Sequence, residues 1–125
     1  MSEKLDQLAQ ELLEKTRNNK LGWIEVESQS DREEFSVALE KEYSFHIVRV
    51  VSGEYRTIAL QLWRNQFPRL EATARNWPSV GAGEDMQQVV KKFRLYSDLF
   101  DAVRESVYGS DETLGEVEQL LRKIG

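Results

Sequence analysis

Several residue types are absent or scarce in this chain of 125 residues, and each absence excludes a class of site. There is no cysteine, so the chain can form no disulfide, thiolate nucleophile or cysteine-ligated metal centre. Its one histidine, His46, excludes a metal site that needs two histidines from the same chain. We therefore expect no metal and no cofactor.

Long apolar runs are also missing. The sequence contains no stretch of about eighteen consecutive apolar residues, the length that a membrane-spanning helix requires. The segment from Met1 to Lys15 carries charges throughout, so it lacks the continuous apolar core of a signal peptide. We expect a soluble, cytoplasmic protein that does not bind membranes.

Basic residues are fewer than acidic ones. The chain has 17 lysines and arginines and 22 acidic residues, so its formal net charge is -5. The densest basic group, formed by Lys91, Lys92 and Arg94, is only a short local run, and we interpret it as a solvated helix face. Proteins that bind nucleic acids cluster such residues to neutralise phosphates. The charge balance therefore disfavours nucleic acid as a partner.

The apolar residues that are present change their spacing along the chain. The length suits one domain over residues 1–125. Near the start, apolar residues three and four apart predict a helix that is capped by Ser2, extends to about Thr16 and ends at Asn18-Asn19. Residues 21–26, rich in β-branched and aromatic side chains, predict a first strand, and polar residues 28–31 a turn.

Alternation with a period of two then predicts a series of strands. A second strand is expected at about residues 33–42, and a third over 43–51 has apolar residues at both parities, which predicts that both of its faces are covered. Ser52-Gly53-Glu54 is a turn signal before a fourth strand at 55–63, so we expect the third and fourth strands to form a hairpin.

The pattern decays over residues 64–83, where Leu70, Ala72 and Ala74 fit either a fifth, edge strand or a short helix. Asp85 with Gln88 resembles a capping box for a long helix over 86–107 that Gly109 ends. Thr113 with Glu116 signals one more short helix. The fold class predicted is α+β: an antiparallel meander sheet of four or five strands, with the first helix, the long helix and the short final helix packed mainly on one face.

No group of residues in the sequence forms a recognisable catalytic motif. His46 lies inside a predicted strand, where it is either an exposed or hydrogen-bonded strand residue or a catalytic base, and no G-x-S-x-G motif supplies a nucleophile. Glutamates occupy polar strand positions that we expect to be solvated: Glu25, Glu27, Glu33, Glu34, Glu40 and Glu42. We expect that the protein is not an enzyme and has no catalytic residues.

The three tryptophans are the best candidates for contact with a partner. Trp23 and Trp63 lie in predicted strands and either fill the core or reach the surface, whereas Trp77 lies beside Pro78 in the irregular segment. Exposed tryptophans are common anchors in interfaces, so Trp77 is the first candidate, followed by Trp63 and Phe67. The alternative for Trp77 is that it fixes its loop onto the domain.

Several segments of the chain resemble a group of small bacterial proteins. They are the run from Lys15-Thr16 to Leu21-Gly22-Trp23, the segments Phe35 to Leu39 and Tyr43 to Ile47, and the helix with Leu95-Tyr96 and Leu99-Phe100. Members of that group have a leading helix that ends in Lys-Thr, a tryptophan that opens the first strand, a β-meander and a closing helix rich in Leu and Tyr. The group has no established activity, so the resemblance implies a bacterial domain and assigns no functional residues.

Three functions remain as hypotheses. The first is a non-enzymatic protein-interaction module, an adaptor or regulatory domain that binds another protein or a second copy of itself as a homodimer. The second is a small-ligand binding domain or unrecognised enzyme, with a pocket between sheet and helices lined by Tyr55, Trp63 and Tyr96. The third is an antitoxin-like or immunity-like inhibitor, because an acidic protein is attracted to basic targets.

Overall fold

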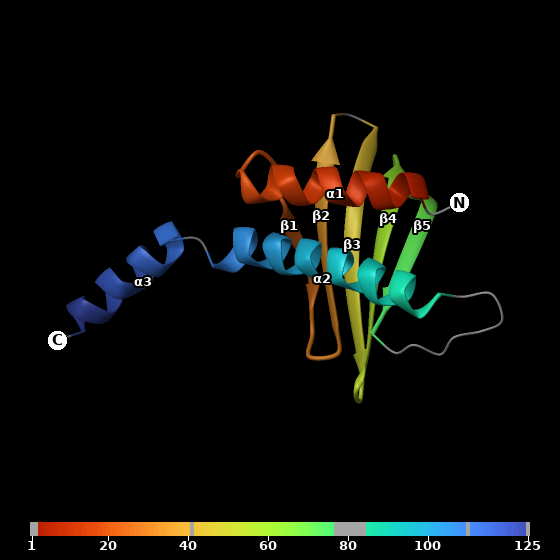
Figure 1. Cartoon of the computed structure of the whole chain (residues 1–125). Coiled ribbons are helices and arrows are strands. Elements are labelled where there is room, and N and C mark those ends of the chain that lie inside the picture. Colours follow the sequence, from red (N-terminus) through yellow and green to blue (C-terminus); the bar gives the residue numbers. More distant parts are fainter. Residues whose placement is uncertain (1–2, 41, 77–84, 110, 125) are drawn as a thin grey trace.

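A computed structural model describes residues 3–40, 42–76, 85–109 and 111–124 of the chain (Figure 1). The elements follow one another as a helix, five strands and two helices. Their bounds are α1 Glu3–Arg17, β1 Ile24–Ser28, β2 Arg32–Leu39, β3 Tyr43–Ser52, β4 Tyr55–Arg64, β5 Phe67–Arg75, α2 Met86–Tyr108 and α3 Asp111–Lys123. The predicted α+β fold class is confirmed.

The five strands form one antiparallel sheet in the order β1-β2-β3-β4-β5, so every strand pairs with its neighbours in the sequence. The predicted meander is therefore confirmed, with β3 in the centre. Leu70, Ala72 and Ala74 lie in β5, so the strand alternative for this segment is correct. A register shift between Leu62 and Trp63 interrupts the pairing of β4 with β5.

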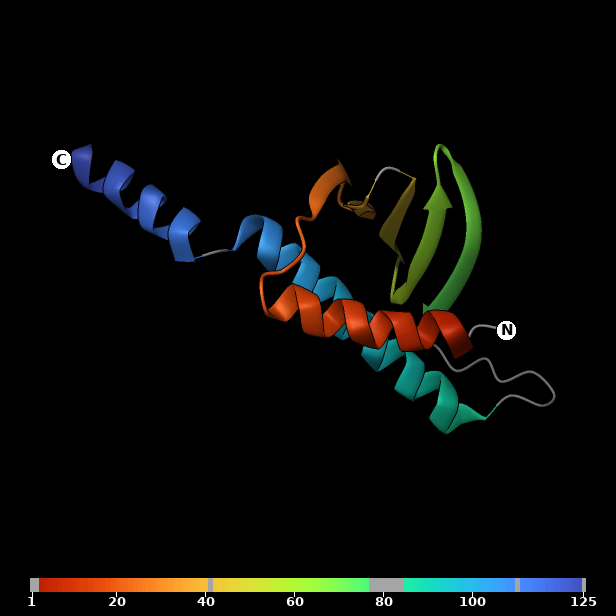
Figure 2. The same ribbon diagram turned by 90° about the horizontal axis from the view of Figure 1, so that it is seen from above.

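Both long helices, α1 and α2, lie on the same face of the sheet (Figures 1 and 2). Seen from above in Figure 2, the opposite face has no helix over it. The core lies between the two layers, and its largest fully buried side chains are Phe35, Ile47, Ile58, Leu60, Tyr96, Leu99, Phe100 and Val103. The expectation that both faces of the third strand are covered holds in part: helices cover only one face, and on the other face Val48 is buried, at 4% exposed.

The end of α1 is fixed to the sheet by a buried hydrogen-bond chain. The Trp23 indole N–H donates to Thr16 Oγ1 at 2.9 Å, and the Thr16 hydroxyl donates to the Leu12 carbonyl oxygen at 2.6 Å. Trp23 is buried, as one of the two sequence-based alternatives predicts. Asn19 has a positive φ of 57°, the left-handed conformation that we expected at the end of this helix.

The long helix begins after Asp85 and ends at Gly109 as the sequence predicts, but the hydrogen bond of its N-terminal cap comes from Gln87 and not from Gln88. The Asp85 side chain accepts a hydrogen bond from the Gln87 backbone N–H, and the Gly109 N–H donates to the Glu105 carbonyl oxygen. At its end, Tyr108 lies edge-on to Phe35 with ring centroids 5.7 Å apart. Because Phe35 belongs to β2, α2 crosses the sheet and ends near the β1 edge (Figure 1).

The short helix α3 continues beyond that edge and extends away from the sheet and from α1 and α2 (Figures 1 and 2). It has no extensive contact with any other described element. The predicted final helix is therefore present, but it does not lie over the sheet. The physical reason is that α2 has already reached the sheet edge where it ends, so the next helix meets no further sheet surface.

Candidate functional site

Polar and aromatic side chains form a continuous row across the sheet face that no helix covers. We call this set the polar row, and its members, from β1 to β5, are Glu27, Arg32, Glu34, His46, Trp63, Gln61 and Glu71. Each one contacts the next through an ion pair, a hydrogen bond or a ring stack. The row therefore connects all five strands on their open face.

His46 is the centre of this row. Its Nδ1 lies 2.7 Å from Glu34 Oε2, and its ring stacks on Trp63 with centroids 4.5 Å apart and an interplanar angle of 23°. On the other side of Glu34, Arg32 Nη1 lies 3.1 Å from Glu34 Oε1. His46 is thus a hydrogen-bonded strand residue, as the first of the two sequence-based alternatives predicts.

The Glu34–His46 pair resembles part of a catalytic triad, because a carboxylate at Nδ1 fixes the orientation of an imidazole. Ser36 of β2 is the residue directly opposite His46 of β3, and it carries a hydroxyl. A triad, however, needs the serine hydroxyl hydrogen-bonded to the imidazole, whereas the His46 ring contacts Glu34 and Trp63. The arrangement accounts better for strand pairing than for nucleophilic catalysis.

On the helix side of the sheet, a second charged group is built around Glu33. Its carboxylate lies 2.7 Å from Arg49 Nη2 and 3.0 Å from Arg104 Nε, so it joins β2 to β3 and to α2. Arg49 also lies over the Phe100 ring, 4.6 Å from the centroid. The prediction that the glutamates are solvated was wrong for Glu33 and Glu34, which are 8% and 9% exposed, because arginines neutralise both carboxylates.

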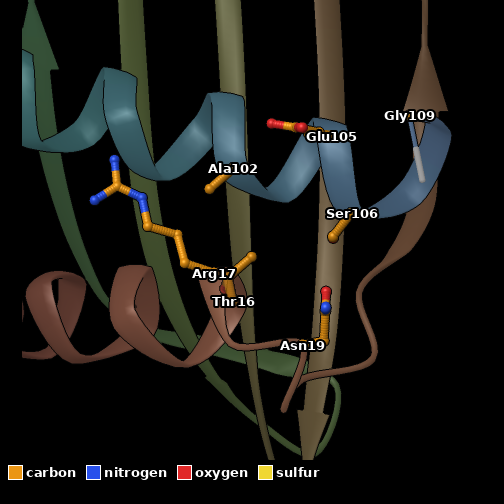
Figure 3. A pocket seen from close by; sticks show the side chains of 7 residues that line it. All are labelled: Thr16, Arg17, Asn19, Ala102, Glu105, Ser106 and Gly109. Carbon is orange, nitrogen blue, oxygen red and sulfur yellow. The ribbon is translucent and has the colours of Figure 1, made fainter. Parts of the chain in front are cut away.

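A cavity of about 490 Å³ lies between the ends of α1 and α2 (Figure 3). In Figure 3 the side chains of Asn19 and Ser106 point toward each other across it. Its lining is mostly polar and consists of Thr16, Arg17, Asn19, Ala102, Glu105, Ser106 and Gly109. Small-molecule sites are usually enclosed and largely apolar, so this cavity supports a ligand function weakly.

The pocket predicted between sheet and helices does not bring its three lining residues together. Tyr96 is fully buried under α1, where its hydroxyl donates to Asp6 Oδ1 at 2.6 Å. Burial and this hydrogen bond raise the pKa of the Tyr96 phenol. Trp63 lies on the opposite face of the sheet in the polar row, and Tyr55 is exposed at the start of β4. Trp63 and Tyr55 lie at opposite ends of β4 and share its open face, whereas Tyr96 of α2 lies on the helix side of the sheet.

A set of exposed apolar side chains lies on α3 and on Ile124, the residue that follows it. These side chains are 47% to 81% exposed, and they recur three and four residues apart, so they share one face: Leu114, Val117, Leu120, Leu121 and Ile124. We call this set the α3 stripe. In globular proteins the apolar stripe of a helix usually packs onto the core, but no described element covers the α3 stripe.

The spacing of the apolar residues predicts the stripe correctly, but we expected the stripe to pack on the sheet. Instead α2 alone spans the sheet, which leaves α3 without a surface of its own chain to pack on (Figure 1). The one available signal was the length of residues 86–107, roughly 34 Å as a helix, which already crosses a small sheet.

The partner candidates from the sequence lie in different places. Phe67 is 65% exposed at the start of the edge strand β5, and Trp63 is half-buried in the polar row. Trp77 lies outside the described residues. The structure does not bring Phe67 and Trp63 into the same surface as α3 (Figure 1).

Comparison of the chain with protein-family models, with curated proteins and with solved structures returned no match. Among the described residues, no group of three or more histidine, cysteine or carboxylate side chains is placed to hold a metal ion. None of the described helices combines the length and the apolar character needed to cross a membrane. We therefore infer the function from the surfaces of the chain itself.

Proposed function

We propose that this protein is a protein-interaction module and that the α3 stripe is its docking surface. The observation that carries the proposal is the exposure of the stripe on a helix that leaves the folded body (Figures 1 and 2). Contiguous apolar surface rimmed by polar side chains is typical of interaction sites. An amphipathic helix that lays its apolar face on a partner is a common mode of recognition.

A second argument comes from the stability of the helix. The 13 residues of α3 contribute nothing to the buried core cluster of the described residues. Isolated helices shorter than about 12–15 residues are marginal in water, and most helical stability in proteins comes from packing of an apolar face. Gly115, inside α3, lowers the intrinsic helix preference further. A partner that covers the stripe would supply the missing stabilisation.

The test immobilises the full chain and exposes it to an extract of the cells that produce it. Leu121→Glu places a charge in the stripe, whereas Gln119→Glu places the same charge on the opposite side of α3. Both residues are exposed and lie outside the core, so neither change should disturb the fold.

We expect quantitative mass spectrometry to find proteins that bind the wild type and Gln119→Glu but not Leu121→Glu. A Trp77→Ala variant tests whether that residue takes part in binding. If all variants retain the same bound proteins, or if none retains any and the chain does not self-associate, the α3 stripe is not a docking surface.

A further inference from the structure

We infer that the partner of the α3 stripe is the α3 stripe of a second copy of this chain, packed in antiparallel orientation. This inference rests on the proposed function and names the partner of the same surface. It is carried by two features of α3: the spacing of its apolar residues and the distribution of its charges.

The apolar spacing is that of an amphipathic helix and also fits pairing with another helix. Leu114, Val117, Leu121 and Ile124 follow one another at intervals of three, four and three residues. This is the alternation of a coiled-coil seam, in which apolar residues repeat on average every 3.5 residues. Leu120 widens the seam on one side. A single stripe of this kind is complementary to itself, as a two-fold symmetric dimer requires.

The charges lie along the two flanks of the stripe and change sign along the helix. At about 100° per residue, Glu118 and Arg122 border one flank, and Glu116 and Lys123 border the other. On both flanks the carboxylate comes first and the cation lies in the last turn. Within one chain, Arg122 Nη2 lies 3.9 Å from Glu118 Oε1, so these side chains already point along the same flank.

This distribution selects the orientation of the pair. In an antiparallel pair each flank faces the same flank of the second copy with its direction reversed. With position 114 opposite position 124, Glu116 lies within one residue of the level of Lys123 of the second copy, and Glu118 lies between Glu118 and Arg122 of the second copy. In a parallel pair opposite flanks face each other in register, so carboxylate meets carboxylate and cation meets cation. Like charges side by side are destabilising, and antiparallel helix dipoles also attract.

The length of α3 limits the strength of this contact. A helix of 13 residues is roughly 20 Å long, so the pair buries less than the standard interface of about 1,600 Å². We expect a reversible dimer whose population depends on concentration and falls as salt screens the flanking charges.

Sedimentation analysis of the full chain over micromolar to millimolar concentrations tests the dimer. We expect the average mass of the wild type and of Gln119→Glu to rise from 14.6 kDa toward twice that value, while Leu121→Glu stays monomeric. A wild type that remains monomeric throughout, or a Leu121→Glu variant that still dimerises, would overturn the inference.

Disulfide trapping tests the orientation, since the chain has no cysteine of its own. Leu114→Cys and Ile124→Cys introduce one thiol each, near opposite ends of the stripe. An antiparallel pair brings position 114 of one copy beside position 124 of the other, so a mixture of the two variants should form the mixed disulfide. If each variant alone crosslinks more readily than the mixture, the helices are parallel and the inference is wrong.

Failure of this inference is distinguishable from failure of the proposed function. A chain that is monomeric at every concentration but loses captured proteins in Leu121→Glu, and not in Gln119→Glu, contradicts the second copy as partner and supports docking of a different protein. A monomeric chain whose captured proteins do not depend on position 121 contradicts both.

Discussion

Glu33 shows how a single buried charge can join a sheet to a helix. Its carboxylate contacts Arg49 of β3 and Arg104 of α2, and it is the only link of this kind that we identify between β2 and α2 among the ion pairs of the described residues. Removing one partner of a buried ionic hydrogen bond costs more than the pair contributes when both are present, because the remaining charges lose their partner.

We expect Glu33→Ala to lower the free energy of unfolding by about 1–3 kcal/mol. The partly exposed Arg104 can turn to solvent, which keeps the loss below that of a fully buried pair. Glu27→Ala is the matched control, because Glu27 is less buried and its pair with Arg32 is worth about 1 kcal/mol or less. Urea titration measures both. Equal losses in the two variants would show that Glu33 is solvated in solution.

Tyr96 makes the stability of the fold sensitive to alkaline pH. Burial and the hydrogen bond to Asp6 raise the pKa of the phenol above its ordinary value of 10.0. The folded state therefore holds a proton that the unfolded chain loses above about pH 10. A raised pKa contributes stability that is complete below the unfolded value and is lost as the pH rises through the range between the two values.

We expect Tyr96→Phe to cost about 1 kcal/mol at pH 7, the net value of one hydrogen bond. The stability difference between the wild type and Tyr96→Phe should shrink as the pH rises above about 10, where ionisation of Tyr96 in the unfolded chain begins. Urea unfolding at several pH values measures it, with Tyr43→Phe as the control at an exposed tyrosine. A difference that stays constant up to pH 11 would contradict this assignment.

Among the elements, the hairpin between β3 and β4 depends on one backbone conformation. Ser52 pairs with Tyr55, so the loop has two residues, and Gly53 at its first position has a positive φ of 62°. That is the position at which a type II′ turn requires glycine. A Cβ at Gly53 would meet nothing within 4 Å, so any cost of a side chain there comes from the backbone alone.

We expect Gly53→Ala to destabilise the protein by about 1 kcal/mol, because an L-residue is strained at positive φ. Gly22→Ala is the control, since a Cβ at Gly22 also meets nothing within 4 Å and its φ is not positive. Thermal or urea unfolding should separate the two variants. The same small effect in both would mean that the turn adopts another conformation.

Local signals predicted the elements well because they are carried by neighbouring residues. The spacing around Leu12, the turn at Gly53 and the end of α2 at Gly109 need no information from distant parts of the chain. The polar row could not be predicted in the same way. Its contact between His46 and Glu34 depends on the register of β2 against β3, which alternation alone does not define.

The position of α3 also needed information beyond the local pattern. An apolar stripe indicates that a helix buries one face, but it does not say which surface covers that face. Here α1 and α2 already occupy the covered side of the sheet, so the stripe at Leu121 remains exposed. An amphipathic helix whose apolar face is not buried in its own chain indicates that this face binds a partner.

At the scale of the whole molecule, the folded body and α3 have separate roles. The body, which contains the core cluster, is complete without α3, because every member of that cluster lies between Leu5 and Val107. The row around His46 places polar side chains across the open sheet face. The α3 stripe adds a set of exposed apolar side chains on an element that lies outside the core cluster.

This separation predicts the effect of removing residues 110–125. We expect the shortened chain to have a free energy of unfolding within about 0.5 kcal/mol of the full chain in dilute solution, the range of changes that do not touch core features. It should also remain monomeric where the full chain dimerises. Circular dichroism should show a loss of helical signal limited to α3, with an unchanged unfolding transition. A loss of more than about 1 kcal/mol would mean that α3 packs on the body in solution, since burial of even one leucine is worth about 1.5–3 kcal/mol, and the stripe would then have an occupant within its own chain.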